Sequence, residues 1–198
     1  DKAAGATSLS DMPKTVFDQL PNSFVDSELG EIPEGWKTGT LGDAIEIHDR
    51  QRIPLSKKQR EARRGHIPYY GATGVIDYVD EPIFDGIHVL LGEDGSVVRE
   101  DGTPFVQYVW GRYWVNNHAH VLSGVNGFGN ELLYVLLQLA DIRPFVTCAV
   151  QAKLNQKNMC SLPIVLPQPE ILSEFQSIVE PWYSLIRTSS DESAVLAR

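Results

Sequence analysis

Basic side chains are concentrated in one short stretch of the chain, between His48 and His66. Only Asp49 and Glu61 oppose them there, so this window carries +5 while the rest of the chain carries −14. A positive stripe on an acidic body marks a place where a polyanion can bind. The basic residues of this stretch, which we call the basic stripe, are Arg50, Arg52, Lys57, Lys58, Arg60, Arg63 and Arg64.

A short helix is predicted inside the basic stripe. Ser56 and Gln59 have the spacing of a capping box, and Gly65 stands where a C-terminal cap belongs. A helix from Lys57 to Arg64 would be roughly 12 Å long and would fit a DNA major groove about 12 Å wide. The alternative is a solvated charged face without a ligand. That alternative must explain why a helix with almost no apolar side forms.

A second polar cluster spans residues 151–158 and is predicted to be a loop. Asn and Gln amides can read adenine with two hydrogen bonds, and Lys suits guanine or phosphate. The alternative is a surface loop whose amides cap backbone groups. The two segments together add further candidates to the basic stripe as DNA-binding residues, namely Gln51, Gln59, Lys153, Asn155, Gln156 and Lys157.

Metal and hydrolytic chemistry finds little support in the sequence. His118 and His120 would share one face of a strand, but Cys148 and Cys160 lack the paired spacing of zinc ligands. No nucleophile elbow, P-loop or dinucleotide fingerprint is present. We therefore predict no catalytic residue and no metal. Several carboxylates could in principle hold a nuclease metal but are better explained as turn residues: Asp77, Asp80, Asp85, Glu93 and Asp94.

The elements that must position these residues are mostly short strands. Between Ile32 and Val125, apolar and β-branched residues recur between turn signals that include Asp-Gly pairs, which favour tight hairpin turns. Nearby aromatic residues, among them Tyr69, Tyr113 and Trp114, are predicted to be mostly core, with one or two free to stack on a base. The predicted strands are Ala44–His48, Ile67–Tyr70, Val75–Val79, Val89–Leu91, Val97–Arg99, Phe105–Trp110 and Trp114–Val121.

Two further helices are predicted. One starts near Asn130 and is apolar nearly all round, which is typical of a buried helix. The other starts near Pro169, and Pro181 is expected to kink it or split it in two. Its apolar residues recur close to every 3.5 positions, so we expect them to form a seam for a partner helix. This seam consists of Ile171, Phe175, Ile178, Trp182 and Leu185.

The overall composition is that of an ordinary globular domain. The chain has 198 residues, 42% of them hydrophobic, which is enough for one core without covalent staples. Two cysteines fit a reducing cytoplasm. The longest apolar run is far shorter than the ~20 residues that span a bilayer, and no signal peptide is visible. We therefore expect a cytoplasmic protein without a membrane partner, cut from a longer chain.

Several short motifs, taken in order, resemble those of a known family. Ser27 to Trp36 is followed by Leu41-Gly42-Asp43, and Tyr69 to Asp77 comes next. Later motifs are Leu90–Gly95, Asn116–Leu122, Lys153–Gln156 and Leu162–Pro167, which precede a helix. This series resembles a target recognition domain of the DNA specificity subunits of type I restriction–modification systems, and the approach to it resembles the second of two such domains.

The resemblance implies a non-catalytic module that reads one half of a bipartite DNA site. It would direct methyltransferase and restriction subunits to double-stranded DNA. Those partners, not this chain, would hold S-adenosylmethionine, ATP and Mg²⁺. The helical seam would pair with a helix of the missing half of the subunit or with a second copy. The basic stripe lies outside the motifs, so its role depends on charge and geometry.

The sequence thus predicts a mixed α/β (α+β) fold with a β-rich body. We expect an irregular lead-in over 1–28, a recognition domain over 29–167 and a helical arm over 168–198. Sequence-specific DNA binding is the favoured function, and about six neutralised phosphates would give a salt slope of roughly −5. The alternatives are a protein-interaction module that docks through the basic stripe and a metal-dependent nuclease.

Overall fold

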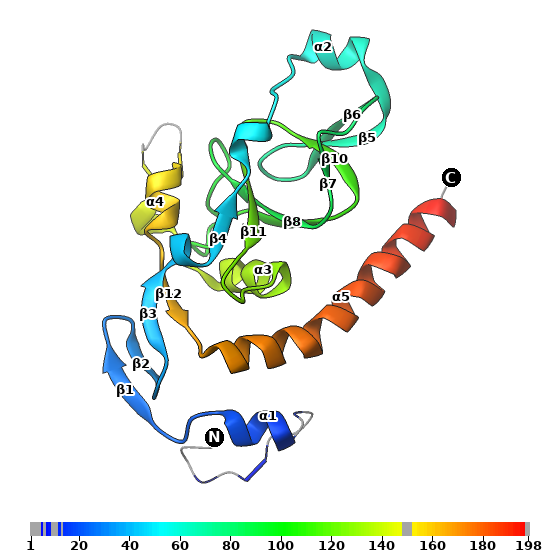
Figure 1. Ribbon diagram of the computed structural model, residues 1–198. Coiled ribbons are helices and arrows are strands. Elements are labelled where there is room, and N and C mark those ends of the chain that lie inside the picture. The colour runs from blue at the N-terminus through cyan, green and yellow to red at the C-terminus, as the bar shows by residue number, and fades with distance from the viewer. Residues whose placement is uncertain (1–4, 6, 9–11, 13, 148–151, 197–198) are drawn as a thin grey trace.

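The computed structural model describes residues 5, 7–8, 12, 14–147 and 152–196. Short strands gather into small sheets, and one long helix, α5 (Pro169–Leu196), runs past them (Figure 1). The mixed α+β class with a C-terminal helical arm is confirmed. Within the described ranges, no helix combines the length and apolar character that crossing a membrane requires.

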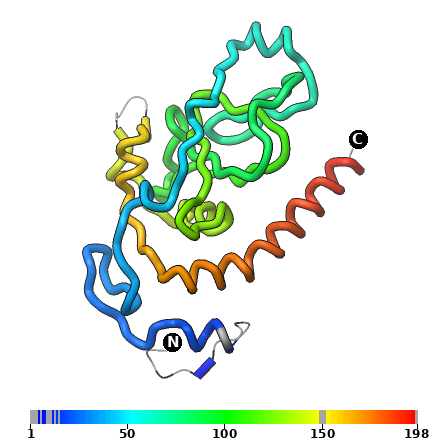
Figure 2. The backbone as a smooth tube through the Cα atoms, viewed as in Figure 1, coloured from blue at the N-terminus to red at the C-terminus, as the bar shows by residue number. Residues whose placement is uncertain are grey.

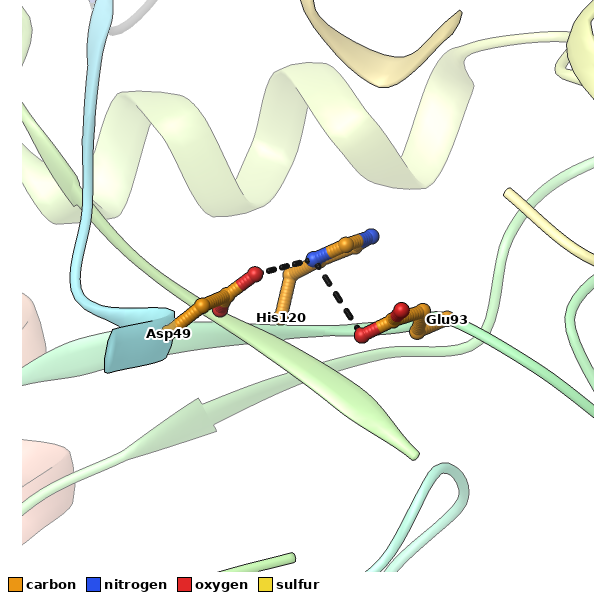
Figure 3. Close-up of side chains that lie close together, drawn as sticks. All are labelled: Asp49, Glu93 and His120. Carbon is orange, nitrogen blue, oxygen red and sulfur yellow. Dashed lines mark hydrogen bonds and ion pairs between the residues drawn. The ribbon is translucent and has the colours of Figure 1, made fainter. Parts of the chain in front are cut away.

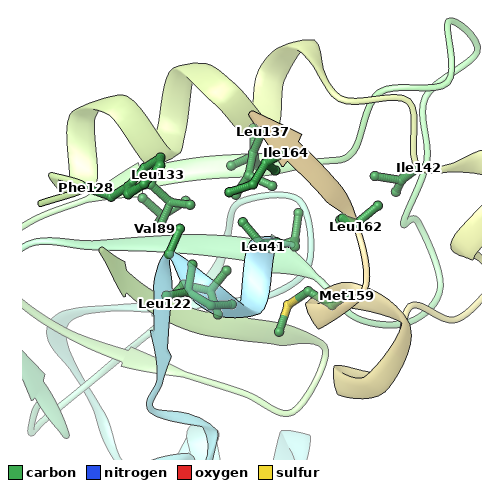
Figure 4. Packing of buried hydrophobic residues seen from close by; sticks show 14 of the residues in the cluster. Leu41, Val89, Leu122, Phe128, Leu133, Leu137, Ile142, Met159, Leu162 and Ile164 are labelled. Carbon is green, nitrogen blue, oxygen red and sulfur yellow. The ribbon is translucent and has the colours of Figure 1, made fainter. Parts of the chain in front are cut away.

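A four-stranded antiparallel sheet forms the middle of the domain. Its order is β4 (Ile45–Ile47), β11 (Ala119–Gly124), β8 (His88–Gly92) and β9 (Val106–Val109). Helix α3 (Asn130–Leu139) packs against it. Buried side chains from these elements, among them Val89, Leu122, Leu133 and Leu137, pack into one core cluster (Figure 4). This core fixes the strand ends that carry the polar residues described below.

A second sheet lies beside the first. Its order is β6 (Val75–Val79), β5 (Arg64–Tyr70), β10 (Arg112–Val115) and β7 (Phe84–Asp85), and only the β5–β10 pair is parallel. Its core contains Tyr69, Val79 and Trp114, while Tyr113 packs with residues of the first sheet. Helix α2 (Lys57–Ala62) leads into β5 and contacts β6.

The N-terminal segment is more ordered than the sequence predicted. Over 14–28, where an irregular lead-in was expected, the chain forms α1 (Lys14–Gln19) and β1 (Phe24–Ser27). Strand β1 pairs with β2 (Gly30–Pro33), so the predicted boundary at 28–29 falls in the turn of a hairpin. Phe17 is buried and α1 contacts α5, which explains how this short helix is held.

The remaining elements join the hairpin to the body of the domain. Strand β3 (Lys37–Thr40) pairs with β12 (Pro163–Leu166), which brings the two ends of the predicted recognition domain together. The short helical segments are η1 (Leu41–Asp43), η2 (Asp49–Gln51), η3 (Arg143–Phe145) and α4 (Gln156–Cys160).

Most of the predicted strands are found, but two predictions are wrong. Trp114–Val121 is not one strand, because β10 ends at Val115 and β11 begins at Ala119. The Asn116 side chain accepts a hydrogen bond from the His118 N–H and closes the turn between them. Val97–Arg99 forms only an isolated bridge, Val98 with Pro104.

Helix α2 begins as predicted and ends differently. The Ser56–Gln59 capping box is formed, which confirms the start of the helix. The C-cap is Arg63, and Gly65 lies in β5. A Cβ atom on Gly65 would lie 2.3 Å from the Val79 carbonyl oxygen, so this glycine permits close strand approach rather than capping the helix.

The two longer helices also depart from expectation in detail. Helix α3 begins at Asn130 as predicted, but only one side of it is buried, and Leu139 is 80% exposed. Helix α5 is continuous through Pro181, so it is not split. Pro181 is exposed, which leaves water to hydrate the carbonyl that loses its N–H partner. The helix is bent along its length (Figures 1 and 2).

Candidate nucleic-acid interface

Helix α2 presents two lysines to solvent. Lys57 and Lys58 are exposed in its first turn, and Arg64 is exposed at the start of β5. These side chains make no ion pair with any residue that the structure describes. Gln59 is exposed too, but its side-chain oxygen accepts hydrogen bonds from the Ser56 backbone and hydroxyl. The basic face of α2 is therefore carried by lysines.

Two arginines of the basic stripe attach α2 to the domain instead. Arg60 donates to Asp77 over 2.8 Å, and its guanidinium lies 5.3 Å from the centre of the Tyr69 ring. The hydrogen bond from Arg60 lowers the pKa of Asp77. These contacts explain why a helix with little apolar surface forms here.

Arg63 makes the corresponding contacts one turn later. It donates to Asp80 and Glu81, and its guanidinium lies 4.9 Å from the centre of the Trp114 ring. Acidic neighbours therefore lie beside α2, but they are paired with arginine. Arg60 and Arg63 have fewer donors left for phosphate than the sequence indicated.

Arg52 is placed inside the molecule, in contrast to its expected position on a DNA-binding surface. Its side chain is only 11% exposed and contacts Asp49 at 3.2 Å and Glu93 at 2.8 Å. The same guanidinium donates to the Ala119 carbonyl. Its neighbours Arg50 and Gln51, on the short helix η2, are exposed. The surface contribution of this segment thus comes from Arg50 and Gln51.

The side chains of Asp49, Glu93 and His120 lie close together (Figure 3), and Arg52 contacts both carboxylates. His120 is fully buried, and its Nδ1 lies 2.6 Å from Asp49 while its Nε2 lies 2.7 Å from the Leu154 carbonyl. Both ring nitrogens of His120 thus lie against oxygen atoms of the domain. This polar network ties η2, β8 and β11 to the chain just before α4.

Asp49 is the centre of this network. Its second oxygen accepts from the Val121 N–H, and Gln156 donates to the oxygen that faces His120. Burial raises the pKa of Asp49, but the hydrogen bond and charge of His120, with the Gln156 and Val121 donors, outweigh it and hold the pKa below its ordinary value. The carboxylate is thus stable in its charged form.

The same three side chains have the ligand types of a metal site. Ligand atoms of Asp49, Glu93 and His120 lie within 4.8 Å of one another. However, the guanidinium of Arg52 contacts both carboxylates and supplies the positive charge that they need. We therefore interpret the cluster as an internal ion network. His118 does not join it, because it pairs with Asp94.

Of the predicted loop over 151–158, residues 152–155 precede α4 and residues 156–158 are its start. Gln151 lies outside the described residues. The Asn155 side chain caps α4 by accepting the Asn158 N–H, which is the backbone-capping alternative. Lys153 is 3.5 Å from Glu93, and the Gln156 amide is held by Asp49. Lys157 is exposed and free of ion pairs in the parts of the chain that the structure covers.

The aromatic residues mostly belong to the core, as predicted. Tyr69, Tyr113 and Trp114 are buried. The exception is Tyr78 on β6, which is 53% exposed on the strand that contacts α2. Tyr78 was not among the predicted binding residues, because its outward position on β6 depends on the register of that strand, which the sequence does not give.

The predicted helical seam is divided between two environments. Ile171 and Phe175 face an apolar groove of this same domain. Ile178, Trp182 and Leu185 are exposed. The second half of α5 is fastened to β9 by Arg187, which donates to the Tyr108 hydroxyl over 2.6 Å. The hydrogen bond from Tyr108 to Glu131 adds α3 to this contact.

Comparisons with known proteins agree on one family. A family model for the type I restriction modification DNA specificity domain matches residues 33–194. A putative type I restriction enzyme specificity subunit of Haemophilus influenzae is 32% identical over 158 residues, which are 80% of this chain and 40% of that protein. The EcoprrI specificity subunit of Escherichia coli is 24% identical over 87% of this chain and 41% of that protein.

A solved structure shows the same fold. The S subunit of a type I restriction-modification system from M. genitalium superimposes with a TM-score of 0.54 at 14% identity, over 79% of this chain and 43% of that one. The chain spans about 40% of the length of the curated relatives that it matches.

Proposed function

The chain belongs to the family of type I restriction modification DNA specificity domains, and from this premise we propose that its DNA-binding surface runs from α2 across η2 to α4. As a specificity domain it recognises a DNA sequence, while cleavage and methylation are the work of other subunits. The domain would read one half of a bipartite site in double-stranded DNA.

The observation that carries this proposal is a group of exposed cations, none of which forms an ion pair with a described residue. They lie on three connected elements, α2 with the start of β5, the short helix η2, and α4, whereas Lys37, Arg99 and Arg112, which are exposed and unpaired in the same sense, lie elsewhere. The Gln156 contact with Asp49 joins α4 to η2, and the five residues 52–56 join η2 to α2. The set consists of Arg50, Lys57, Lys58, Arg64 and Lys157.

Within this surface the side chains divide by task. Lysines and arginines neutralise phosphates and position the duplex, and polar or aromatic side chains beside them read bases. Gln51 and Gln59 lie among the exposed cations, and Tyr78 adds an exposed ring on the neighbouring strand. Asn155 and Gln156 hold this surface in place, because Asn155 caps α4 and the amide of the exposed Gln156 donates to Asp49.

The test compares two double variants that remove the same charge. Lys57→Ala/Lys58→Ala lies on the proposed surface, and Lys14→Ala/Lys37→Ala lies on α1 and β3. We expect the first variant to bind a random-sequence duplex about tenfold or more weakly, since it loses two phosphate contacts, and the second to bind as the parent chain does. Equal affinities of the two variants in fluorescence anisotropy would overturn the proposed surface.

A protein-interaction module is the second candidate, and one observation favours it. Arg60 and Arg63 of the basic stripe already pair with carboxylates, those of Asp77, Asp80 and Glu81, so an acidic polypeptide offers groups that this stripe binds. A preference of the chain for an acidic polypeptide such as polyglutamate over duplex DNA, at equal charge concentration, would support that candidate.

We further propose how the chain is assembled with its partners. The exposed residues Ile178, Trp182 and Leu185 form the part of the seam that pairs with a helix of the other half of the subunit or with a second copy. Methyltransferase and restriction subunits, which hold S-adenosylmethionine, ATP and Mg²⁺, complete a cytoplasmic complex. A concentration-dependent increase in mass in sedimentation, lost in Trp182→Ser/Leu185→Ser, tests the seam.

A further inference from the structure

An apolar groove lies between the N-terminal hairpin and the body of the domain. It measures about 410 Å³, and every residue that lines it is apolar. Its walls are α3, β12 and the first turns of α5, with Leu29 and Trp36 from the hairpin side. In Figures 1 and 2 this region lies at the opposite end of the molecule from α2. The groove is therefore separate from the proposed DNA-binding surface.

The groove is open to solvent, and its walls include exposed apolar side chains and a polar group without a hydrogen-bond partner in the described part of the chain. Leu139 on α3 is 80% exposed, and Leu29 in the hairpin turn is 40% exposed. The indole N–H of Trp36 is buried and has no hydrogen-bond acceptor among the residues that the structure describes. Contiguous exposed apolar surface of this kind is typical of a binding site for another molecule.

The segments that build the groove are predominantly acidic, although Lys37 directly follows the lining residue Trp36. Residues 15–36, 125–142 and 158–186 contain no lysine or arginine, and they contain five, two and three carboxylates respectively. Three of these carboxylates directly precede a lining residue: Glu28 before Leu29, Glu170 before Ile171 and Glu174 before Phe175. An occupant must therefore combine an apolar surface with positive charge at its flanks.

We propose that this groove binds an amphipathic helix of a partner protein, with an apolar face flanked by lysines and arginines. Apolar grooves commonly take such a helix through residues spaced three and four apart. A second copy of this chain does not fit. Its cationic helix α2 has no apolar face, and its exposed apolar residues on α5 lie in an acidic segment that the groove would repel.

The experiment uses synthetic peptides of about 14 residues with leucines at helical spacing. One peptide has lysine at the other positions and the second has glutamate. In isothermal titration at physiological ionic strength, the lysine peptide is expected to bind the intact chain at least about tenfold more tightly than the glutamate peptide.

Matched variants separate the groove from general charge attraction. Leu29→Ser/Leu139→Ser removes two exposed lining side chains and keeps the charge, so it should weaken lysine-peptide binding about tenfold. Val75→Ser/Ile76→Ser removes exposed apolar side chains of β6, 41% and 51% exposed, and should leave it unchanged. Glu28→Gln/Glu170→Gln should weaken binding severalfold and reduce its dependence on salt.

Three outcomes would overturn the proposal. The two peptides bind equally, or Leu29→Ser/Leu139→Ser binds the lysine peptide as the parent chain does, or sedimentation shows a dimer of the chain that this variant abolishes. The last outcome would show that a second copy of the chain occupies the groove. Circular dichroism of each variant shows whether it is folded, and the DNA affinity of the groove variants should equal that of the parent chain.

Discussion

Asp49 shows at the scale of single residues how the domain holds together the elements of the proposed DNA-binding surface. One carboxylate accepts hydrogen bonds from Val121, His120 and Gln156 and contacts Arg52. These partners come from segments that are far apart in the chain. The exposed Arg50 and Gln51 follow Asp49 directly, and Lys157 follows Gln156. The buried carboxylate therefore sets the spacing between two parts of the proposed surface.

Replacing this carboxylate by an amide tests that role. Asp49→Asn keeps the shape but places an N–H₂ group opposite donors and leaves Arg52 with less opposing charge. We expect a loss of about 2–4 kcal/mol in the free energy of unfolding, measured with urea. The exposed change Glu61→Gln should alter it by less than about 0.5 kcal/mol. A similar small loss for both variants would show that the network does not stabilise the fold.

His88 gives the stability a dependence on pH. Burial, together with the charge of nearby His48, lowers the pKa of His88 from 6.5 to about 4. Between these values the unfolded chain binds more protons at this site than the folded chain, so the free energy of unfolding falls as the pH is lowered. Because the ring is only half-buried, we expect this site to contribute on the order of 1–2 kcal/mol.

The measurement compares urea unfolding at several pH values for the parent chain and His88→Asn. Asparagine stays neutral and can keep a hydrogen bond to Tyr113, to which the His88 Nδ1 is bonded. The variant should show a smaller loss of stability between pH 6.5 and pH 4. The same loss in both chains would assign the pH dependence to other groups.

The sequence predicted the cations of the proposed DNA-binding surface better than it predicted the polar network around Asp49. The cluster of cations was visible because its members are neighbours in the chain. The pairing of Arg52, Arg60 and Arg63 was not, since their partners lie far along the chain: Asp77 in β6, Asp80 just after β6 and Glu93 just after β8. His120 and Glu93 each entered a separate metal hypothesis, and only the fold brings them to Asp49.

At the scale of elements, local signals predicted starts better than ends. The capping box of α2 and the Asn130 start of α3 depend on contacts within a few residues, and both are confirmed. The end of α2 depends on how β5 approaches β6, which no local pattern contains. The turn at Asn116 was missed because a side-chain hydrogen bond closes it without glycine or proline.

A substitution at Gly65 measures how much the free energy of unfolding depends on the close approach of β5 to β6. A Cβ on Gly65 would meet the Val79 carbonyl and the Asp80 backbone, at 2.3 Å and 2.5 Å, and backbone cannot move aside as a side chain can. Gly65→Ala should therefore lower the free energy of unfolding by more than about 2 kcal/mol. Gly95→Ala, at a positive φ but in open space, should cost only about 1 kcal/mol. If both variants lose the same free energy of unfolding in thermal denaturation, Gly65 is needed for its backbone conformation at the helix end and not for close strand approach.

The whole molecule separates its charges. Exposed cations are concentrated on α2, η2 and α4, whereas the segments around the apolar groove carry an excess of carboxylates. An acidic body repels DNA everywhere except at the basic surface, so charge orients the domain before any base is read. Net charge alone, at −9, would have predicted no affinity for nucleic acid.

This arrangement fixes how DNA affinity depends on salt. Each neutralised phosphate contributes about −0.9 to the log–log slope, so the five exposed cations assigned to the proposed surface predict a slope of roughly −4 to −5. That range is close to the value of about −5 expected from the sequence, although a different set of side chains supplies it. Lys57→Ala/Lys58→Ala should make the slope less steep by about 2, and Lys14→Ala/Lys37→Ala should not change it. A salt titration of a random-sequence duplex by fluorescence anisotropy measures all three. A slope near zero, or one that both variants alter equally, would mean that the acidic body rather than the basic surface controls binding.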